Sequence, residues 1–191
     1  MQVRILIATL LSLLAFHSTA TECTQSLKAS SPVIAIGAFS NMRYSEEHAY
    51  GYVVELWRAD DCLFGLFFSS SGLIGDTPAG RIENISYDKI TRSISFDARL
   101  TMGVIPASTA PTHTWIPSQD AYKFSGILGK DSLGGTLSHE ILNYQGKRTL
   151  SSEKLTLPLT ADDTVGMNNS RTFSEWGTFV ESLLHHRGPK W

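Results

Sequence analysis

The clearest pattern in this chain is an alternation of apolar and polar residues over positions 93–102. Apolar side chains occupy every second position from Ile94 to Met102, with polar residues such as Asp97 and Arg99 between them. A period of two is typical of a β-strand that buries one face. We therefore expect an antiparallel strand here, with Ile94 facing the core and Asp97 facing water.

Seven further segments have the composition of strands, and short turn sequences separate several of them. Asp60-Asp61 and Lys130-Asp131 lie between pairs of these segments, as the turns of β-hairpins do. The seven segments are Val33 to Phe39, Ala49 to Arg58, Cys62 to Ser69, Arg81 to Tyr87, Tyr122 to Leu128, Leu133 to Ile141 and Thr149 to Leu159. Together with the alternating segment they predict about eight strands.

Two of the predicted hairpins share a faint internal repeat. The segments Leu56 to Gly65 and Ile127 to Gly135 each contain an apolar strand end, a turn with Asp, then Leu and a glycine two residues later. A glycine within a strand marks a bend or a close approach of two backbones, and strongly curved sheets need such positions. The repeat indicates either a curved sheet or the ordinary likeness of two hairpins.

The period of the pattern changes near the C-terminus. Asp162 to Asn169 is a polar linker, and Thr172 with Glu175 three residues later forms a capping-box sequence. Apolar residues then recur at helical spacing from Phe173 to Leu184, and Arg187-Gly188-Pro189 ends the run. The spacing predicts an amphipathic helix of about 15 residues that docks on the outside of the sheet. A helix lying on a membrane surface is the alternative.

The first twenty residues have the organisation of a secretory signal peptide. Met1 to Arg4 is basic, Ile5 to Phe16 is mostly apolar, and Ser18-Thr19-Ala20 supplies the small residues that a signal peptidase recognises. The apolar run is shorter than the span of about 20 residues that crosses a bilayer. We expect cleavage after Ala20, export to the periplasm or the extracellular space, and a soluble mature chain without a membrane span.

The chain has two cysteines, Cys23 and Cys62. In an exported chain, two cysteines most simply form one disulfide. Such a bond would close a loop of about 40 residues and stabilise the fold by roughly 4 kcal/mol. The sequence contains no Cys-x-x-Cys, so a structural role near the mature N-terminus is favoured over redox catalysis.

These elements predict a mainly β fold, an antiparallel meander barrel of about eight strands with one C-terminal amphipathic helix. A flattened β-sandwich is the alternative. The expected organisation is a signal peptide over residues 1–20, a barrel domain over 21–160, and a linker with the helix over 161–191. Closure of the barrel depends on pairing between Val33 to Phe39 and Thr149 to Leu159, which lie far apart in the sequence.

In outline, the signal peptide, the meander strands and the C-terminal helix resemble the calycin-like barrels, the lipocalins and their relatives. The Gly-x-Trp signature of lipocalins is absent, and Ile36-Gly37-Ala38 stands where it would be expected. The chain also resembles small secreted bacterial proteins of uncharacterised function that carry a comparable hairpin. An eight-stranded barrel either holds one small ligand or is filled by its own side chains.

Composition and motifs exclude several classes of function. Hydrophobic residues make up 42% of the 191 residues, which excludes a wholly disordered chain. The 16 basic and 18 acidic residues give a net charge of −2, which gives no support for nucleic-acid binding. No Gly-x-Ser-x-Gly, His-Glu-x-x-His, phosphate loop or dinucleotide fingerprint is present. The sequence therefore assigns no catalytic residue, metal ligand or cofactor.

Candidate ligand-binding residues lie on the predicted inner faces of the strands. Tyr52, Phe96 and Phe124 alternate onto these faces, and His139 shares a strand face with Leu137. Mostly apolar pockets orient their ligands with a few polar groups. His139 is either such a group or a core histidine bonded to a tyrosine or to the backbone.

The long connection from Gly103 to Asp120 adds a fifth candidate, Trp115. The connection contains three prolines and also His113. Long connections are often functional. The pattern predicts either a flap across the barrel mouth or a loop that Trp115 anchors on the barrel wall.

Three functions stay open from the sequence. The first is an exported protein that binds a small, largely apolar ligand. The second is a protein-interaction module, such as an inhibitor of an extracellular enzyme, with contacts from Arg43-Tyr44, Asp76 to Pro78 and Trp115. The third is an enzyme, which a carboxylate close to His139 inside a cavity would favour.

Overall fold

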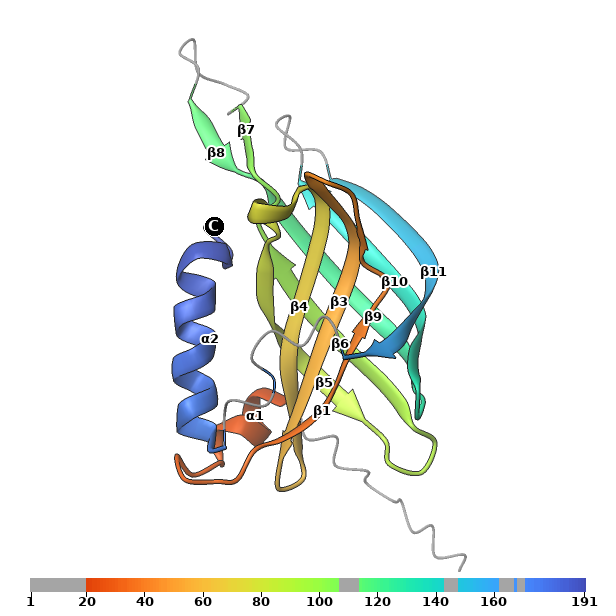
Figure 1. Cartoon of the computed structure of the whole chain (residues 1–191), viewed down its shortest axis with the longest axis vertical. Helices are drawn as coiled ribbons and strands as arrows, with labels where there is room; N and C mark the ends of the chain where they lie inside the picture. Colours follow the sequence, from red (N-terminus) through yellow and green to blue (C-terminus); the bar gives the residue numbers. More distant parts are fainter. Residues whose placement is uncertain (1–19, 107–113, 143–147, 162–166, 168–170) are drawn as a thin grey trace, which may run out of the picture.

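The computed structural model describes residues 20–106, 114–142, 148–161, 167 and 171–191. Its central feature is a closed antiparallel barrel of eight strands with a helix along its outside (Figure 1). All eight predicted strands are present, and closure rules out the flattened sandwich. Around the wall the strands are β1 (Ile34–Ser40), β3 (His48–Ala59), β4 (Cys62–Leu73), β5 (Ala79–Tyr87), β6 (Ser93–Leu100), β9 (Gln119–Leu128), β10 (Ser132–Leu142) and β11 (Arg148–Thr160).

Six smaller or flanking elements complete the described part of the chain. They are α1 (Ala20–Gln25), β2 (Arg43–Tyr44), the 3₁₀ turn η1 (Ile74–Asp76), β7 (Val104–Pro106), β8 (Trp115–Pro117) and α2 (Phe173–Arg187). The strands β7 and β8 pair with each other and form a ribbon that projects beyond one end of the barrel (Figure 1). The predicted signal peptide, apart from Ala20, and His113 lie outside the described residues, as does most of the predicted linker.

The barrel closes through the pairing that the sequence analysis predicted, between β1 and β11. Ala38 and Phe39 of β1 pair with Thr160 and Leu159 of β11, while β1 pairs along its length with β3. The earlier part of β11 pairs with β10 alone among the described strands. The C-terminal end of β11 therefore closes the barrel against β1. The N-terminal end of β11 lies at the open end of the barrel.

Side chains of the inner faces fill the barrel. On β6, Ile94, Phe96, Ala98 and Leu100 are buried, while Arg99 is exposed, as the alternation predicts. The buried inner cluster also includes Phe39, Val54, Phe67, Phe124, Leu137 and Leu157. Packed aromatic and aliphatic side chains thus occupy the middle layers of the barrel.

The glycine repeat marks two places where paired strands approach closely. A Cβ atom at Gly65 would lie 2.1 Å from the backbone oxygen of Glu55, and one at Gly135 would lie 2.3 Å from that of Ser125. A Cβ at Gly135 would also lie 2.8 Å from Cζ of Phe124, which packs beside this glycine. The curved-sheet interpretation of the repeat is therefore supported, because both positions lack space for a side chain.

The helix α2 packs on the outside of the barrel. Its residues Trp176 and Val180 are buried in an outer cluster with Trp57, Phe64 and Leu66 of the neighbouring strands. This explains why β4 is apolar on both faces: one faces the interior and the other faces the helix. The capping box forms as predicted at the N-terminus of α2. No helix in the described ranges is long and apolar enough to cross a membrane.

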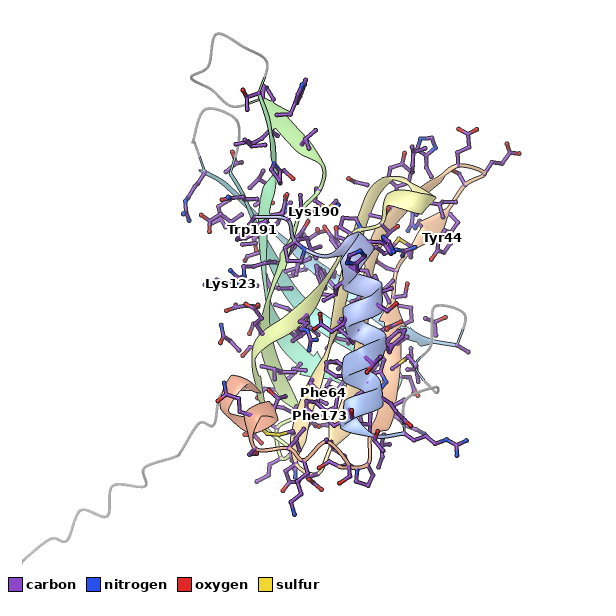
Figure 2. All side chains as sticks on the ribbon, turned by 90° about the vertical axis from the view of Figure 1, so that its left-hand side faces the viewer. Tyr44, Phe64, Lys123, Phe173, Lys190 and Trp191 are labelled. Carbon is purple, nitrogen blue, oxygen red and sulfur yellow. A yellow bond between two sulfur atoms is a disulfide. The ribbon has the colours of Figure 1, made fainter. Side chains whose placement is uncertain are left out.

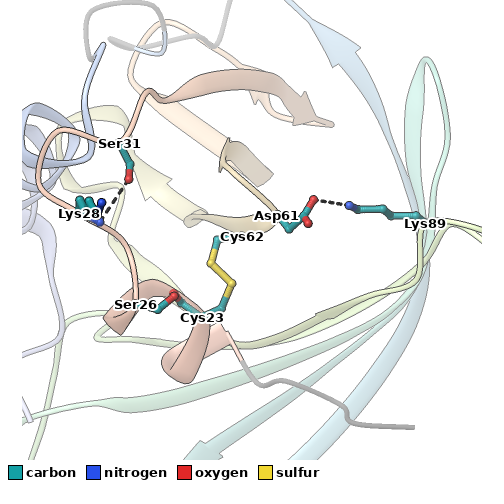
Figure 3. The surroundings of a disulfide bond; sticks show 7 residues. All are labelled: Cys23, Ser26, Lys28, Ser31, Asp61, Cys62 and Lys89. Carbon is teal, nitrogen blue, oxygen red and sulfur yellow. Dashed lines mark hydrogen bonds and ion pairs between the residues drawn. A yellow bond between two sulfur atoms is a disulfide. The ribbon is translucent and has the colours of Figure 1, made fainter.

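The two cysteines form the predicted disulfide (Figure 3). Cys23 belongs to α1 and Cys62 begins β4, so the bond ties the short N-terminal helix to the barrel. It lies beside the β3–β4 turn, where Asp61 forms an ion pair with Lys89. The disulfide therefore secures the end of the barrel opposite the β7–β8 ribbon.

Candidate functional site

A buried carboxylate–histidine pair lies at the end of the barrel from which the β7–β8 ribbon projects. Nε2 of His139 on β10 is 2.6 Å from Oδ1 of Asp120 on β9. Asp120 is 2% exposed, whereas the side chain of His139 is 20% exposed. The register places Asp120 and His139 diagonally across adjacent strands, since His139 pairs with Tyr122.

Asp120 is held in place by a second hydrogen bond. The hydroxyl of Ser118 donates to Oδ2 of Asp120 at 3.0 Å, and the backbone N–H of Met102 donates to the Ser118 oxygen at 2.8 Å. Both carboxylate oxygens of Asp120 therefore accept a hydrogen bond. A buried carboxylate held in this way fixes the orientation of the histidine ring.

An aromatic ring and a hydroxyl surround the histidine. The ring of Tyr122 stacks on His139 with centroids 4.1 Å apart and planes 10° from parallel. The Tyr122 hydroxyl donates to Oγ of Ser69 on β4 at 3.3 Å. The histidine thus lies between the apolar interior and the polar rim.

A tyrosine–carboxylate contact joins β3 to β11 at the same end of the barrel. The Tyr52 hydroxyl donates to Oε1 of Glu153 at 2.7 Å, and the Tyr52 and Tyr122 ring centroids are 6.3 Å apart. We call the six residues at this end the mouth cluster. They are Tyr52, Ser69, Asp120, Tyr122, His139 and Glu153.

The mouth cluster has the groups that orient a ligand or move a proton. Asp120 engages Nε2 of His139, and no described residue forms a hydrogen bond with Nδ1. An oriented imidazole whose second nitrogen forms no hydrogen bond with a described residue is suited to accept a proton or a hydrogen bond. Among the described residues, no serine or cysteine side chain forms a hydrogen bond with this imidazole.

The structure separates the five predicted ligand residues into three places. Tyr52 and His139 belong to the mouth cluster. Phe96 and Phe124 lie deeper, with stacked rings 5.1 Å apart, and both are almost fully buried. Trp115 lies on the β7–β8 ribbon and is 59% exposed. Trp115 therefore lies apart from the other four residues, all of which point into the barrel.

Sequence reasoning missed Ser69, Asp120, Tyr122 and Glu153 as members of the site. The predicted strand began at Tyr122, which left Asp120 at the end of the long connection, whereas β9 begins at Gln119. Glu153 is in phase with the inner-face residues Leu155 and Leu157 on β11. For Asp120 and Glu153, the available signal was an acidic residue at a position that points to the same side of its strand as the inward-facing residues.

Burial raises the pKa of the Tyr122 phenol, and burial with the Glu153 hydrogen bond raises the pKa of Tyr52. An unfolded tyrosine ionises near pH 10. Above that pH the folded chain holds these protons and the unfolded chain releases them, so stability falls as the pH rises. The stabilisation is fully present below about pH 9.

We therefore expect Tyr122 to make the free energy of unfolding fall above pH 10, by up to about 1.4 kcal/mol per pH unit. Urea unfolding of the wild type, Tyr122→Phe and Tyr50→Phe at pH 8 and pH 11 measures this. Tyr122→Phe should reduce the pH dependence, whereas Tyr50, which is exposed, serves as the control. An equal decrease for the wild type and Tyr122→Phe would contradict the expectation.

The described residues contain no group of three or more His, Cys, Asp or Glu side chains arranged to hold a metal ion.

Comparison with protein-family models, with curated proteins and with solved structures finds no match for this chain. The site is therefore interpreted from its own geometry.

Proposed function

We propose that this chain is an exported binding protein that holds a small, largely apolar ligand at the mouth of its barrel. The observation that carries the proposal is the buried Asp120–His139 pair, which leaves Nδ1 of a partly exposed imidazole available. Sites that bind small molecules combine apolar walls with a few fixed polar groups. In this arrangement His139 hydrogen-bonds the polar group of the ligand, and Tyr122 supplies an apolar wall.

Because side chains fill the interior, a pocket in the depth of the barrel is no longer proposed, and we assign the ligand to the mouth. Phe96 and Phe124 occupy the middle layer and support the mouth cluster from below. Export is supported by the disulfide and by the signal-peptide pattern of the first twenty residues. The up-and-down barrel with a C-terminal helix agrees with the calycin resemblance at the level of architecture.

Native mass spectrometry of the protein purified from its exported fraction tests the proposal. We expect a species heavier than the disulfide-bonded chain by the mass of one small molecule. His139→Ala should lower its occupancy by about tenfold or more, since one hydrogen bond to the ligand is lost. His48→Ala, on the β2–β3 hairpin, is the matched control and should retain the molecule.

Two results together would overturn this function. One is a wild-type mass that equals the chain alone. The other is a His139 imidazole NMR signal that does not move when an extract of the exported fraction is added. Thermal unfolding of His139→Ala is measured in parallel, so that loss of fold is not mistaken for loss of binding.

A protein-interaction module is the second candidate, and the β7–β8 ribbon favours it. Val104, Trp115 and Ile116 on this ribbon are 62%, 59% and 40% exposed, and exposed apolar groups that cluster indicate interaction surfaces. The same mass spectra distinguish the two functions. A bound protein that is lost in Trp115→Ala but kept in His139→Ala would support the second candidate.

A further inference from the structure

A groove of about 480 Å³ lies beside the mouth, between the upper part of β4, the β6–β7 connection and the C-terminal end of α2. We call it the rim groove. Figure 2 shows its α2 side, where Lys190 and Trp191 follow the end of the helix near the β7–β8 ribbon. Its volume is within the range of about 300–1,000 Å³ that is usual for small-molecule sites.

The groove exists because the strands separate at the rim and carry glycines there. β4 pairs with β5 over three positions only, Leu66 to Phe68, so the end of β4 lies apart from β5. A Cβ atom built at Gly72, Gly75 or Gly103 would have no atom within 4 Å. The backbone therefore faces open space at three places along the wall.

Among the lining residues whose side chains the structure describes, the ionisable ones are His186, Arg187 and Lys190, and none of these described side chains is acidic. This contrasts with the whole chain, which has more acidic than basic residues. Among the described residues, the Arg187 and Lys190 side chains beside the groove have no ion-pair partner.

The segment that carries Lys190 is fixed against the barrel. The backbone N–H of Lys190 donates to Oγ1 of Thr101 at 3.0 Å, and Nε1 of Trp191 donates to the backbone oxygen of Leu100 at 3.0 Å. The guanidinium of Arg99 lies 5.3 Å from the centroid of the Trp191 ring. The basic end of α2 is therefore held in position over β6.

The rest of the lining is apolar or carries hydroxyls. Leu73, Met102 and Val104 provide apolar surface, with Leu73 and Val104 both more than half exposed, and Ser70 and Ser71 provide hydroxyls. We propose that the rim groove binds a small amphipathic anion, whose carboxylate, sulfate or phosphate group faces Arg187 and Lys190. Its apolar body covers Leu73, Met102 and Val104. No residue of the mouth cluster is among the described lining residues, although the Met102 backbone also bonds to Ser118, which holds Asp120.

Binding of decanoate and of decanol, which differ in the charge of the head group, tests the inference. Isothermal titration calorimetry should give a dissociation constant for decanoate at least tenfold below that for decanol, because basic groups attract only the anion. The double variant Arg187→Gln/Lys190→Gln should make the two affinities equal. Lys123→Gln changes one exposed charge on the outer face of β9, away from the groove (Figure 2), and should change neither affinity.

A second variant tests the place of binding without altering charge. Gly72→Leu adds a side chain to open groove space and should weaken decanoate binding at least tenfold. If decanoate binds at the mouth instead, His139→Ala should weaken its binding while both groove variants retain it, so the two proposals are distinguishable. Equal wild-type affinities for decanoate and decanol, or decanoate binding that survives both groove variants, would overturn the inference. So would sedimentation with phosphatidylglycerol vesicles, which would indicate a lipid surface in place of a free anion.

Discussion

Replacing Trp176 with alanine is expected to lower the free energy of unfolding by about 3–5 kcal/mol, the usual cost of removing a large buried aromatic side chain. Trp176 is 3% exposed and is the central contact of α2 with the barrel. Its ring centroid lies 4.6 Å from that of Phe64 and 5.9 Å from that of Trp57, both on the barrel wall. The guanidinium of Arg81 lies 5.3 Å from the centroid of the same ring.

Urea unfolding followed by circular dichroism measures this loss. The matched control is Ser182→Ala, an exposed position on the same helix, which should change stability by less than about 0.5 kcal/mol. Because the end of α2 forms one wall of the rim groove, Trp176→Ala should also weaken decanoate binding. A loss below about 1 kcal/mol would show that the helix does not depend on this contact.

Local patterns in the sequence predicted the elements of the fold well. The alternation around Ile94 identified β6 and the correct inner face, because a half-buried strand imposes a period of two along one short segment. The Thr172 and Glu175 pair identified the start of α2, because a capping box involves four consecutive residues. The paired glycines, Gly65 and Gly135, indicated close strand approach for the same local reason.

The candidate site was harder to predict, because its members come from five strands. Tyr52 and Glu153 are 101 positions apart and meet only because the barrel closes. His139 was identified as an inner-face residue, but its partner Asp120 was assigned to a connection, so the pair was not foreseen. The rim groove likewise depends on how far β4 and β6 separate and on where α2 ends. A periodic pattern within one segment does not predict such distances between separate strands and helices.

Removing the disulfide is the second change with a large expected effect. The double variant Cys23→Ser/Cys62→Ser frees a loop whose ends are 39 positions apart. The loop-entropy relation gives a loss of about 4 kcal/mol in the free energy of unfolding. This is a large fraction of the 5–15 kcal/mol that a typical domain has in total. Urea unfolding of the oxidised wild type, the reduced wild type and the double variant measures it.

The expected pattern separates stability from function, because the bond acts mainly on the unfolded chain. The disulfide ties α1 to the start of β4, at the end opposite the mouth cluster. The reduced protein and the double variant should therefore unfold at the same, lower urea concentration. Where they are still folded, the His139 imidazole signal should be unchanged. A shifted His139 signal in the folded double variant would show instead that the bond shapes the mouth. An unchanged signal would mean that the disulfide contributes to the stability of this barrel and not to the geometry of its site.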